Sequence, residues 1–227
     1  IKDDNKMQFA EKYFDKLTGK DATDDFGRPA TEWKYDGDKI GTYADNADDS
    51  MVINKSLDGD VVLSTNSDYF GYTKKDFASS VDAYINGDQV TGVKGYDTLN
   101  ALKIKAGDQV EVFENDDDKV ETIAVIRYSL AVIDEVDTKL SSTYTKKGAT
   151  YSITLKALDE DVSIGGTYYD KYDNDSAKEL AGFAADTYKA DTAIAVALNS
   201  KNVVLASHVA DSVSGKVTGY DKGSKAN

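Results

Sequence analysis

Residues 108–125 read Asp-Gln-Val-Glu-Val-Phe-Glu-Asn-Asp-Asp-Asp-Lys-Val-Glu-Thr-Ile-Ala-Val, and this stretch decides the fold class. Apolar and polar residues largely alternate on both sides of the acidic turn 115–118, which is typical of a β-hairpin with one buried face. Residues 191–209 follow the same plan about 84 residues further along, with Asn199 opening the turn. We therefore expect two copies of one small β module, the alternative being two unrelated β-hairpins that resemble each other through their acidic turns.

Other turn signals and short apolar runs extend both copies. Asn86-Gly87 is the strongest turn signal, because a type I′ hairpin needs a positive φ at both central residues. Helices are predicted at 73–81, where Thr73 and Asp76 match a capping box, and at 176–185. The remaining predicted strands are Val61–Ser64, Ala83–Ile85, Leu102–Ile104, Leu130–Val136, Thr150–Leu155, Val162–Ile164 and Ser214–Tyr220, and Gly165-Gly166 is predicted as a turn.

The N-terminal part of the chain has a different pattern. Residues 6–17 carry apolar side chains at helical spacing and are followed by Gly19, which predicts a short amphipathic helix. From Asp21 to Gly59 polar residues dominate around a few aromatic anchors, so we expect an irregular segment. The predicted fold is therefore mainly β: an N-terminal helix and irregular segment (1–59), then two small β-barrel or β-sandwich modules with short inserted helices (60–137 and 138–227).

Composition excludes several classes of function. A net charge of −14 disfavours nucleic acid and anionic lipid, because both are bound by basic surfaces. The chain has no cysteine, so disulfides and thiolate chemistry are excluded. It contains no apolar run long enough to span a membrane, and we expect no membrane insertion. The chain opens at Ile1 and ends in a polar tail, which we interpret as a piece cut from a longer exported protein.

The most distinctive motif is Asp-Asp-Phe-Gly-Arg-Pro-Ala-Thr-Glu-Trp, which ends at Trp33. Pro29, the only proline in the chain, fixes its own φ and keeps Arg28 extended. Gly27 permits a turn beside Phe26, and Trp33 can bury a large apolar area. We interpret the motif as structural, an aromatic clasp between the N-terminal helix and the first β module, in preference to a ligand site.

This motif resembles a segment of clostridial surface proteins that carry S-layer homology domains. Four other phrases are similar to those proteins, namely Tyr84-Ile-Asn-Gly87, Ile104-Lys-Ala-Gly-Asp-Gln-Val-Glu-Val-Phe113, Asp118-Lys-Val-Glu-Thr-Ile123 and Ser212-Val-Ser-Gly-Lys-Val-Thr-Gly-Tyr-Asp221. The S-layer homology domains themselves, which hold the wall polymer in such proteins, are not evident in the sequence. The resemblance implies a non-anchoring extracellular segment at the cell surface or in the cell wall of a Gram-positive bacterium.

No residue pattern predicts catalysis. The only histidine, His208, follows Ser207 on an alternating strand, so the two side chains are expected on opposite faces of the sheet. The 41 acidic residues offer so many carboxylate pairs that no spacing selects one for glycoside hydrolysis. We therefore predict no catalytic residue and no enzymatic activity.

Two groups of residues near position 170 are candidates for ligand binding. Asp170, Asp173 and Asp175 offer hard oxygen ligands for calcium, although they lack the spacing of an EF-hand. We expect this loop to be solvated, and calcium is the one cofactor that the sequence leaves open. Tyr168, Tyr169 and Tyr172 could form a platform for sugar rings, but tyrosines in thin β modules more often cap small cores.

The sequence thus predicts a non-catalytic structural segment of a surface-layer or wall-associated protein, which acts as a spacer and packing module. Its expected partners are other surface-protein modules or further copies of the chain. The alternative is an extracellular binding module or adhesin that recognises a glycan or a host protein. A third alternative, a hydrolase, would need an acidic cluster in a cleft with a raised pKa.

Overall fold

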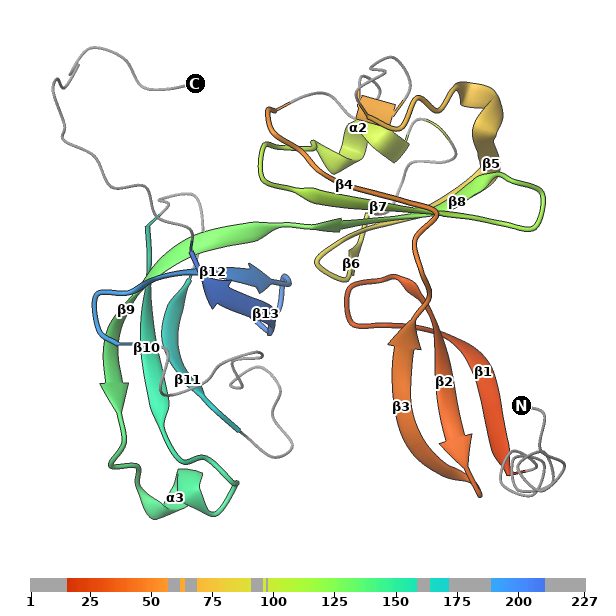
Figure 1. Cartoon of the computed structure of the whole chain (residues 1–227). Coiled ribbons are helices and arrows are strands. Elements are labelled where there is room, and N and C mark those ends of the chain that lie inside the picture. The colour runs from red at the N-terminus through yellow and green to blue at the C-terminus, as the bar shows by residue number, and fades with distance from the viewer. Residues whose placement is uncertain are drawn as a thin grey trace, which may run out of the picture.

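A computed structural model describes residues 16–56, 62–63, 69–90, 96, 98–158, 164–171 and 189–210. The prediction of a mainly β protein is confirmed: the described chain forms three sheets with a few short helices (Figure 1). The sheets curl into half-barrels, in agreement with the predicted barrel-like or sandwich-like modules. We call them the N-terminal, middle and C-terminal sheets.

The N-terminal sheet replaces the predicted irregular segment. It is an antiparallel meander of β1 (Leu17–Thr23), β2 (Pro29–Tyr35) and β3 (Asp38–Ala44). The prediction of irregular structure was wrong because both faces of this sheet are largely exposed, so its strands lack the apolar alternation of a buried face. The predicted helix at 6–17 lies mostly outside the described residues, but Leu17 and Gly19 belong to β1.

The middle sheet has the strand order β4-β7-β8-β5-β6. The β7–β8 hairpin is antiparallel, whereas β5 lies parallel to β8. A buried apolar cluster covers one side and includes residues from α2 (Thr98–Leu102). The strands are β4 (Asp49–Val52), β5 (Phe77–Ile85), β6 (Asp88–Gln89), β7 (Gln109–Glu114) and β8 (Val120–Ile126).

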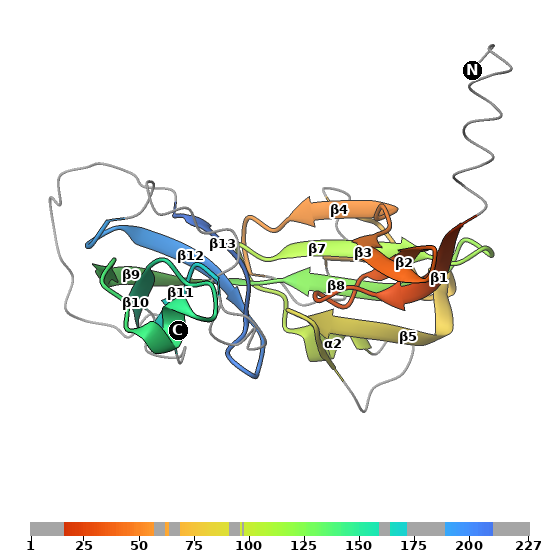
Figure 2. The same cartoon turned by 90° about the horizontal axis from the view of Figure 1, so that it is seen from below.

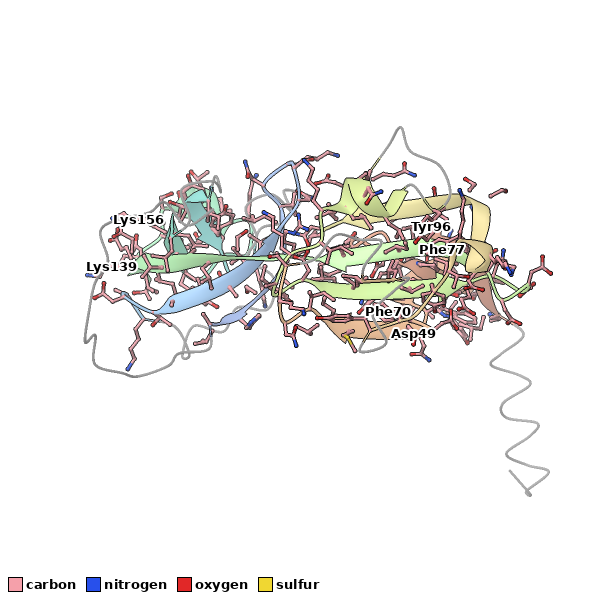
Figure 3. The ribbon with its side chains drawn as sticks, turned by 90° about the horizontal axis from the view of Figure 1, so that it is seen from above. Asp49, Phe70, Phe77, Tyr96, Lys139 and Lys156 are labelled. Atoms are coloured by element: carbon pink, nitrogen blue, oxygen red, sulfur yellow. The ribbon has the colours of Figure 1, made fainter. Side chains whose placement is uncertain are left out.

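An aromatic row packs on the buried cluster of this sheet (Figure 3). Phe70 stacks on Tyr72, with 6.2 Å between ring centroids, and Tyr72 meets Phe77 edge-on at 6.1 Å. Phe77 in turn meets Tyr96 edge-on at 5.0 Å. The Tyr72 hydroxyl donates a 2.6 Å hydrogen bond to Asp49 on β4. The row therefore connects β4 with the start of β5.

Three predicted elements of the middle sheet were assigned to the wrong type. The capping box at Thr73 is present, because the Asp76 carboxylate accepts bonds from the Thr73 amide and hydroxyl, both at 2.7 Å. The helix that it opens is only the short η2 (Lys74–Asp76), after which the chain continues as β5. Leu102, predicted as a strand residue, ends α2, and Val62 and Leu63 are buried in a helical turn.

The C-terminal sheet is antiparallel throughout, with the order β11-β10-β9-β12-β13. Its buried cluster includes Ile133, Ile153 and Val196. Gly165-Gly166, predicted as a turn, opens β11, and the predicted elements at 176–185 and 214–220 lie outside the described residues. The elements are β9 (Tyr128–Asp137), α3 (Ser142–Thr145), β10 (Ser152–Ala157), β11 (Gly165–Tyr169), β12 (Ala193–Leu198) and β13 (Val204–Val209).

Sheet boundaries do not coincide with the predicted segment boundaries at residues 59 and 137. β4, before residue 59, pairs with β7 in the middle sheet. β9, placed in the first module by the sequence, pairs with β10 and β12 in the C-terminal sheet. Only Arg127 separates β8 from β9, so one long extended segment runs from the middle sheet into the C-terminal sheet (Figures 1 and 2).

The two predicted hairpins match each other at a constant offset of 84 residues. β7 corresponds to β12 and β8 to β13, and both ladders shift register just before the turn. In each turn an Asn side chain, Asn115 or Asn199, accepts two backbone N–H bonds of 3.0–3.1 Å. The residues three positions later, Asp118 and Asn202, have φ values of 54° and 58°.

The correspondence includes a third strand. β4 pairs with β7 on the side where β9 pairs with β12. Ile53 donates to the Asp108 carbonyl at 2.8 Å, and Ile133 makes the equivalent 3.0 Å bond to Thr192. We call β4, β7 and β8 the first unit, and β9, β12 and β13 the second unit. The sheets then differ, because β5 and β6 extend the first unit beyond β8 whereas β10 and β11 extend the second beyond β9.

Candidate functional site

The three sheets meet around the turn between β5 and β6 (Figure 1). Asn86 and Gly87 form this turn with φ values of 48° and 78°, as a type I′ hairpin requires. Ile85 pairs with Asp88 at its base. The turn itself was predicted from the Asn-Gly pair, whereas its contacts with both neighbouring sheets depend on residues far away in the sequence.

The Asn86 side chain connects the middle sheet to the C-terminal sheet. It is only 5% exposed, and its amide nitrogen donates to the carbonyls of Arg127 and Leu198, both at 2.8 Å. Its oxygen accepts the Arg127 N–H, also at 2.8 Å. A buried amide with these partners is well satisfied, and one side chain thereby fixes both the β8–β9 connection and the end of β12.

A second contact crosses the same boundary and borders a pocket of about 460 Å³. The Asp88 carboxylate accepts bonds from the Ser200 amide and hydroxyl, the latter at 2.7 Å. Arg127 also lines the pocket, but its guanidinium is held by Asp108 at 2.6 and 2.8 Å. Asp88, Ser200 and Arg127 are thus all held by partners at the boundary of the sheets, as in a structural joint.

Two glycines permit the N-terminal sheet to approach the same turn. At Gly87 an added Cβ would lie 2.1 Å from the carbonyl oxygen of Asp25, in the β1–β2 loop. At Gly27, whose φ is 85°, an added Cβ would lie 2.1 Å from the ring of Tyr84. Any larger residue at either position would push the N-terminal sheet away from the middle sheet.

Arg28 adds an electrostatic contact between these two sheets. Its guanidinium lies 2.7 Å from Asp24 in its own loop, 3.4 Å from Glu111 on β7, and 5.1 Å from the centre of the Phe26 ring. Burial lowers the pKa of Arg28, but the bonds to Asp24 and the charges of Asp24 and Glu111 outweigh burial and raise it above its ordinary value. The guanidinium therefore stays charged and bound.

The residues of the clasp motif lie between two sheets. Phe26, Gly27 and Arg28 join the N-terminal sheet to the middle sheet, while most of the helix predicted as their partner lies outside the described residues. Trp33 on β2 is less buried than predicted, because 36% of it is exposed. Part of its ring is exposed because the N-terminal sheet has no second layer among the described residues.

An exposed pair of aromatic rings was missed by the sequence reasoning. Trp33 pairs with Gly19 on one side and Gly41 on the other. An added Cβ on Gly19 would lie 3.1 Å from the Trp33 ring, and one on Gly41 would lie 3.0 Å from the Tyr43 ring. The two rings therefore rest on glycines in one row across the sheet, and Tyr43 is 57% exposed. We call Trp33 and Tyr43 the aromatic pair.

The predicted tyrosine platform is not formed by the residues that the structure describes. Tyr168 and Tyr169 lie on β11 and are only 4% and 6% exposed. Burial raises the pKa of Tyr168, and Tyr169 stacks on Tyr144 with 4.5 Å between ring centroids. Buried rings cannot offer their faces to a sugar, so both belong to the core. Tyr172 lies outside the described residues.

The predicted calcium ligands can be assessed only at Asp170. Its carboxylate accepts bonds from the Thr150 amide and hydroxyl at 2.8 and 2.6 Å and from the Tyr151 amide at 3.2 Å. Burial raises the pKa of Asp170, but these bonds outweigh it and lower the pKa below its ordinary value. Asp173 and Asp175 lie outside the described residues. Within the described ranges, no three acidic or histidine side chains cluster as metal ligands.

His208 is on β13, as predicted. It pairs with Ala195, while Ser207 pairs with Val196, so the two side chains leave opposite faces of the sheet. The imidazole meets the Tyr128 ring edge-on, with 4.6 Å between centroids. This contact gives His208 a packing role at the start of β9.

Comparisons with protein-family models, with curated proteins and with solved structures gave no match to this chain. In the part of the chain that the structure describes, no helix is long and apolar enough to cross a membrane. The junction and the exposed surfaces are therefore the features of the molecule that bear on its function.

Proposed function

We propose that this chain is a non-catalytic structural segment of a bacterial surface-layer or cell-wall-associated protein, located outside the cell, where it acts as a spacer and packing module. The observation that carries this proposal is the junction at Asn86 and Gly87, where three small sheets are joined. A spacer must hold its modules in fixed orientations, and this requires specific contacts between them.

The junction meets this requirement because it has specific contacts to both the C-terminal and the N-terminal sheet. Asn86 and the Asp88–Ser200 bonds hold the C-terminal sheet, while Arg28 and the close glycine contacts hold the N-terminal sheet. A buried amide that loses its hydrogen-bond partners costs free energy. The observed orientation of each sheet is therefore more stable than orientations in which these bonds are broken. The acidic surface, with a net charge of −14, keeps such a segment soluble.

Small-angle X-ray scattering tests the stiffness that the proposal requires. The wild-type curve should fit a single arrangement of the three sheets, whereas Asn86→Ala should increase the maximum dimension and require several orientations of the C-terminal sheet. Asn46→Ala, at an exposed position, is the matched control and should leave the curve unchanged. A wild-type curve that already requires many orientations would contradict a spacer role.

The aromatic pair supports a second candidate function, that of a module or adhesin that binds a neutral glycan. Trp33 rests on a glycine of β1, and Tyr43 rests on a glycine of β3 in the same row. Because β1 and β3 are two strand spacings apart, the two rings lie roughly 10 Å from each other. Such flat, amphipathic rings suit the apolar faces of sugars. Saturable binding on a glycan array that Trp33→Ala abolishes and Ile40→Ala preserves would favour this function, and an array without binding would remove it.

A further inference from the structure

The N-terminal sheet has two faces of different chemistry. Side chains alternate between the faces along each strand, and the cross-strand register shows which of them share a face. One face carries Glu32, which is paired with Lys34 at 3.3 Å and with Lys39 at 2.9 Å. The opposite face carries the aromatic pair, and we call it the aromatic face. It includes Gly19, Asp21, Thr31, Trp33, Gly41 and Tyr43.

The aromatic pair lies along one row that crosses the strands. Trp33 on β2 pairs with Gly19 on β1 and with Gly41 on β3. The Trp33 ring rests over Gly19, whereas the Tyr43 ring rests over Gly41. Because β1 and β3 flank β2, a ligand that contacts both rings has to run across the three strands and not along them.

The charges of the aromatic face complement an uncharged ligand that is rich in hydroxyl groups. The described residues of this face include no lysine or arginine, and exposed Asp21 lies beside Thr31 in the neighbouring row, about 7 Å along the strands. A carboxylate accepts hydrogen bonds from sugar hydroxyls and repels other anions. In a chain of net charge −14, a glycan with carboxylate or phosphate groups would be repelled here.

The spacing of the two rings selects among uncharged polysaccharides. In a β-1,4-linked chain of glucose units, the bonds between units are equatorial, so the chain is a nearly flat ribbon with apolar C–H faces. Each unit is turned over relative to the next, and every second unit therefore presents the same face. This repeat of two units is about 10 Å long, which is twice the spacing of neighbouring strands. Two alternate units can thus stack on the two rings at the same time.

We propose that the aromatic face binds an extended, uncharged β-1,4-linked polysaccharide that crosses β1, β2 and β3. One sugar unit stacks on Trp33, and the second unit further along the polysaccharide stacks on Tyr43. Asp21 and Thr31 bind hydroxyl groups along one side of the ribbon. This inference rests on the second candidate function, glycan binding, and names the class of its ligand and the direction in which the ligand lies.

Tryptophan fluorescence reports the proposed contact directly, because Trp33 is the only tryptophan in the chain. Titration of the full chain with cellotetraose, four glucose units joined by β-1,4 bonds, should change the emission saturably. Cellobiose, with two units, is too short to reach both rings and should bind about tenfold more weakly, the effect of one lost ring contact. Maltotetraose has the same four units joined by α-1,4 bonds, which curve the chain, and it should bind no better than cellobiose.

Two tyrosine variants test the direction of the ligand while Trp33 remains as the reporter. Tyr43→Ala should weaken the binding of cellotetraose about tenfold and leave the binding of cellobiose unchanged. Tyr35→Ala is the matched control, because Tyr35 is on the same face in a different row and is 37% exposed. It should leave both affinities unchanged. Both tyrosines are exposed, so thermal unfolding of the two variants should match that of the wild type.

Five results would overturn the proposal. Trp33 emission that acrylamide does not quench in the free chain would show that the chain itself covers this face. Cellotetraose that leaves the emission unchanged would show that the face does not bind this polymer. Equal affinities for cellobiose and cellotetraose would show that only one ring makes contact, and equal affinities for maltotetraose and cellotetraose would show that the linkage is not recognised. A loss in Tyr35→Ala as large as in Tyr43→Ala would show that the ligand lies along the strands.

The glycan array separates this inference from the function on which it rests. Another neutral glycan that binds and that Trp33→Ala releases, without binding of cellotetraose, would remove the β-1,4-linked ligand and retain the glycan-binding function. An array without any binding would remove both. Neither result would affect the spacer role, which the scattering experiment tests separately.

Discussion

At the scale of single residues, Gly87 has a conformational and a steric reason to be glycine. Its φ of 78° is unfavourable for other residues, and the space for a side chain is occupied by the Asp25 carbonyl. Gly71 separates the two effects, because it has a φ of 74° and nothing within 4 Å of an added Cβ. The two positions therefore form a matched pair.

We expect Gly87→Ala to lower the free energy of unfolding by at least about 2 kcal/mol more than Gly71→Ala does. Both variants carry the strain of a positive φ, of about 1–2 kcal/mol, but only the first forces two backbones apart. Urea denaturation of both variants measures the difference. Equal losses would show that the contact between Gly87 and Asp25 contributes nothing to stability.

Tyr72 gives the protein a predictable response to alkaline pH. Burial raises the pKa of Tyr72, and its bond to Asp49 raises it further. In the unfolded chain the phenol ionises near pH 10. Above that pH the unfolded state binds fewer protons than the folded state, so stability is complete below about pH 10 and falls as the pH rises.

Tyr72→Phe should therefore reduce the slope with which stability falls between about pH 9.5 and 11. The slope should not vanish, because the pKa values of Tyr84 and Tyr168 are also raised, mainly by burial. Urea denaturation at several pH values measures the slope. Tyr43→Phe, on an exposed tyrosine, is the control, and an effect as large as that of Tyr72→Phe would contradict the assignment.

At the scale of elements, the two hairpin turns should respond equally to the same substitution. Asn115 and Asn199 each accept two backbone bonds within their turns. Asn115→Ala and Asn199→Ala should each lower the free energy of unfolding by about 0.5–1.5 kcal/mol. Asn46→Ala serves as the control. A loss confined to one hairpin would mean that the two turns are equivalent only in geometry.

These hairpins were predictable because their signals are local. An Asn-containing turn between alternating strands specifies its own pairing within about twenty residues, and the Asn86-Gly87 turn did the same. The segment 73–81 was misassigned because its capping box is real but its apolar residues, Phe77, Val81 and Ala83, pack against a distant hairpin. Tertiary context decided between helix and strand there.

The junction was predictable only in part for the same reason. Local constraints indicated a structural role for Gly27, Arg28 and Pro29. The sequence could not show that Arg28 meets Glu111 or that Asn86 meets Leu198, because these partners lie 83 and 112 residues away. The exposure of Trp33 was missed since an aromatic residue in a polar segment is usually a buried anchor.

At the scale of the whole molecule, the Asn86 contacts couple the unfolding of the middle and C-terminal sheets. Wild-type protein should unfold in one calorimetric transition, because Asn86 and Asp88 join the two apolar clusters. Asn86→Ala should broaden this transition or split it in two, as each sheet then unfolds more independently. An unchanged single transition would show that the long segment through Arg127 is sufficient for coupling.

The parallel pair β5–β8 also affects how the protein forms during synthesis. β4 and β5 leave the ribosome before the β7–β8 hairpin that both of them pair with, so β4 has no partner when it emerges and β5 has only the two-residue strand β6. The C-terminal sheet can instead begin with the consecutive strands β9, β10 and β11. Non-local pairing is slow to form. The middle sheet, although synthesised earlier, should therefore be the slower of the two to complete. It should also be the more prone to aggregation while its strands are still unpaired.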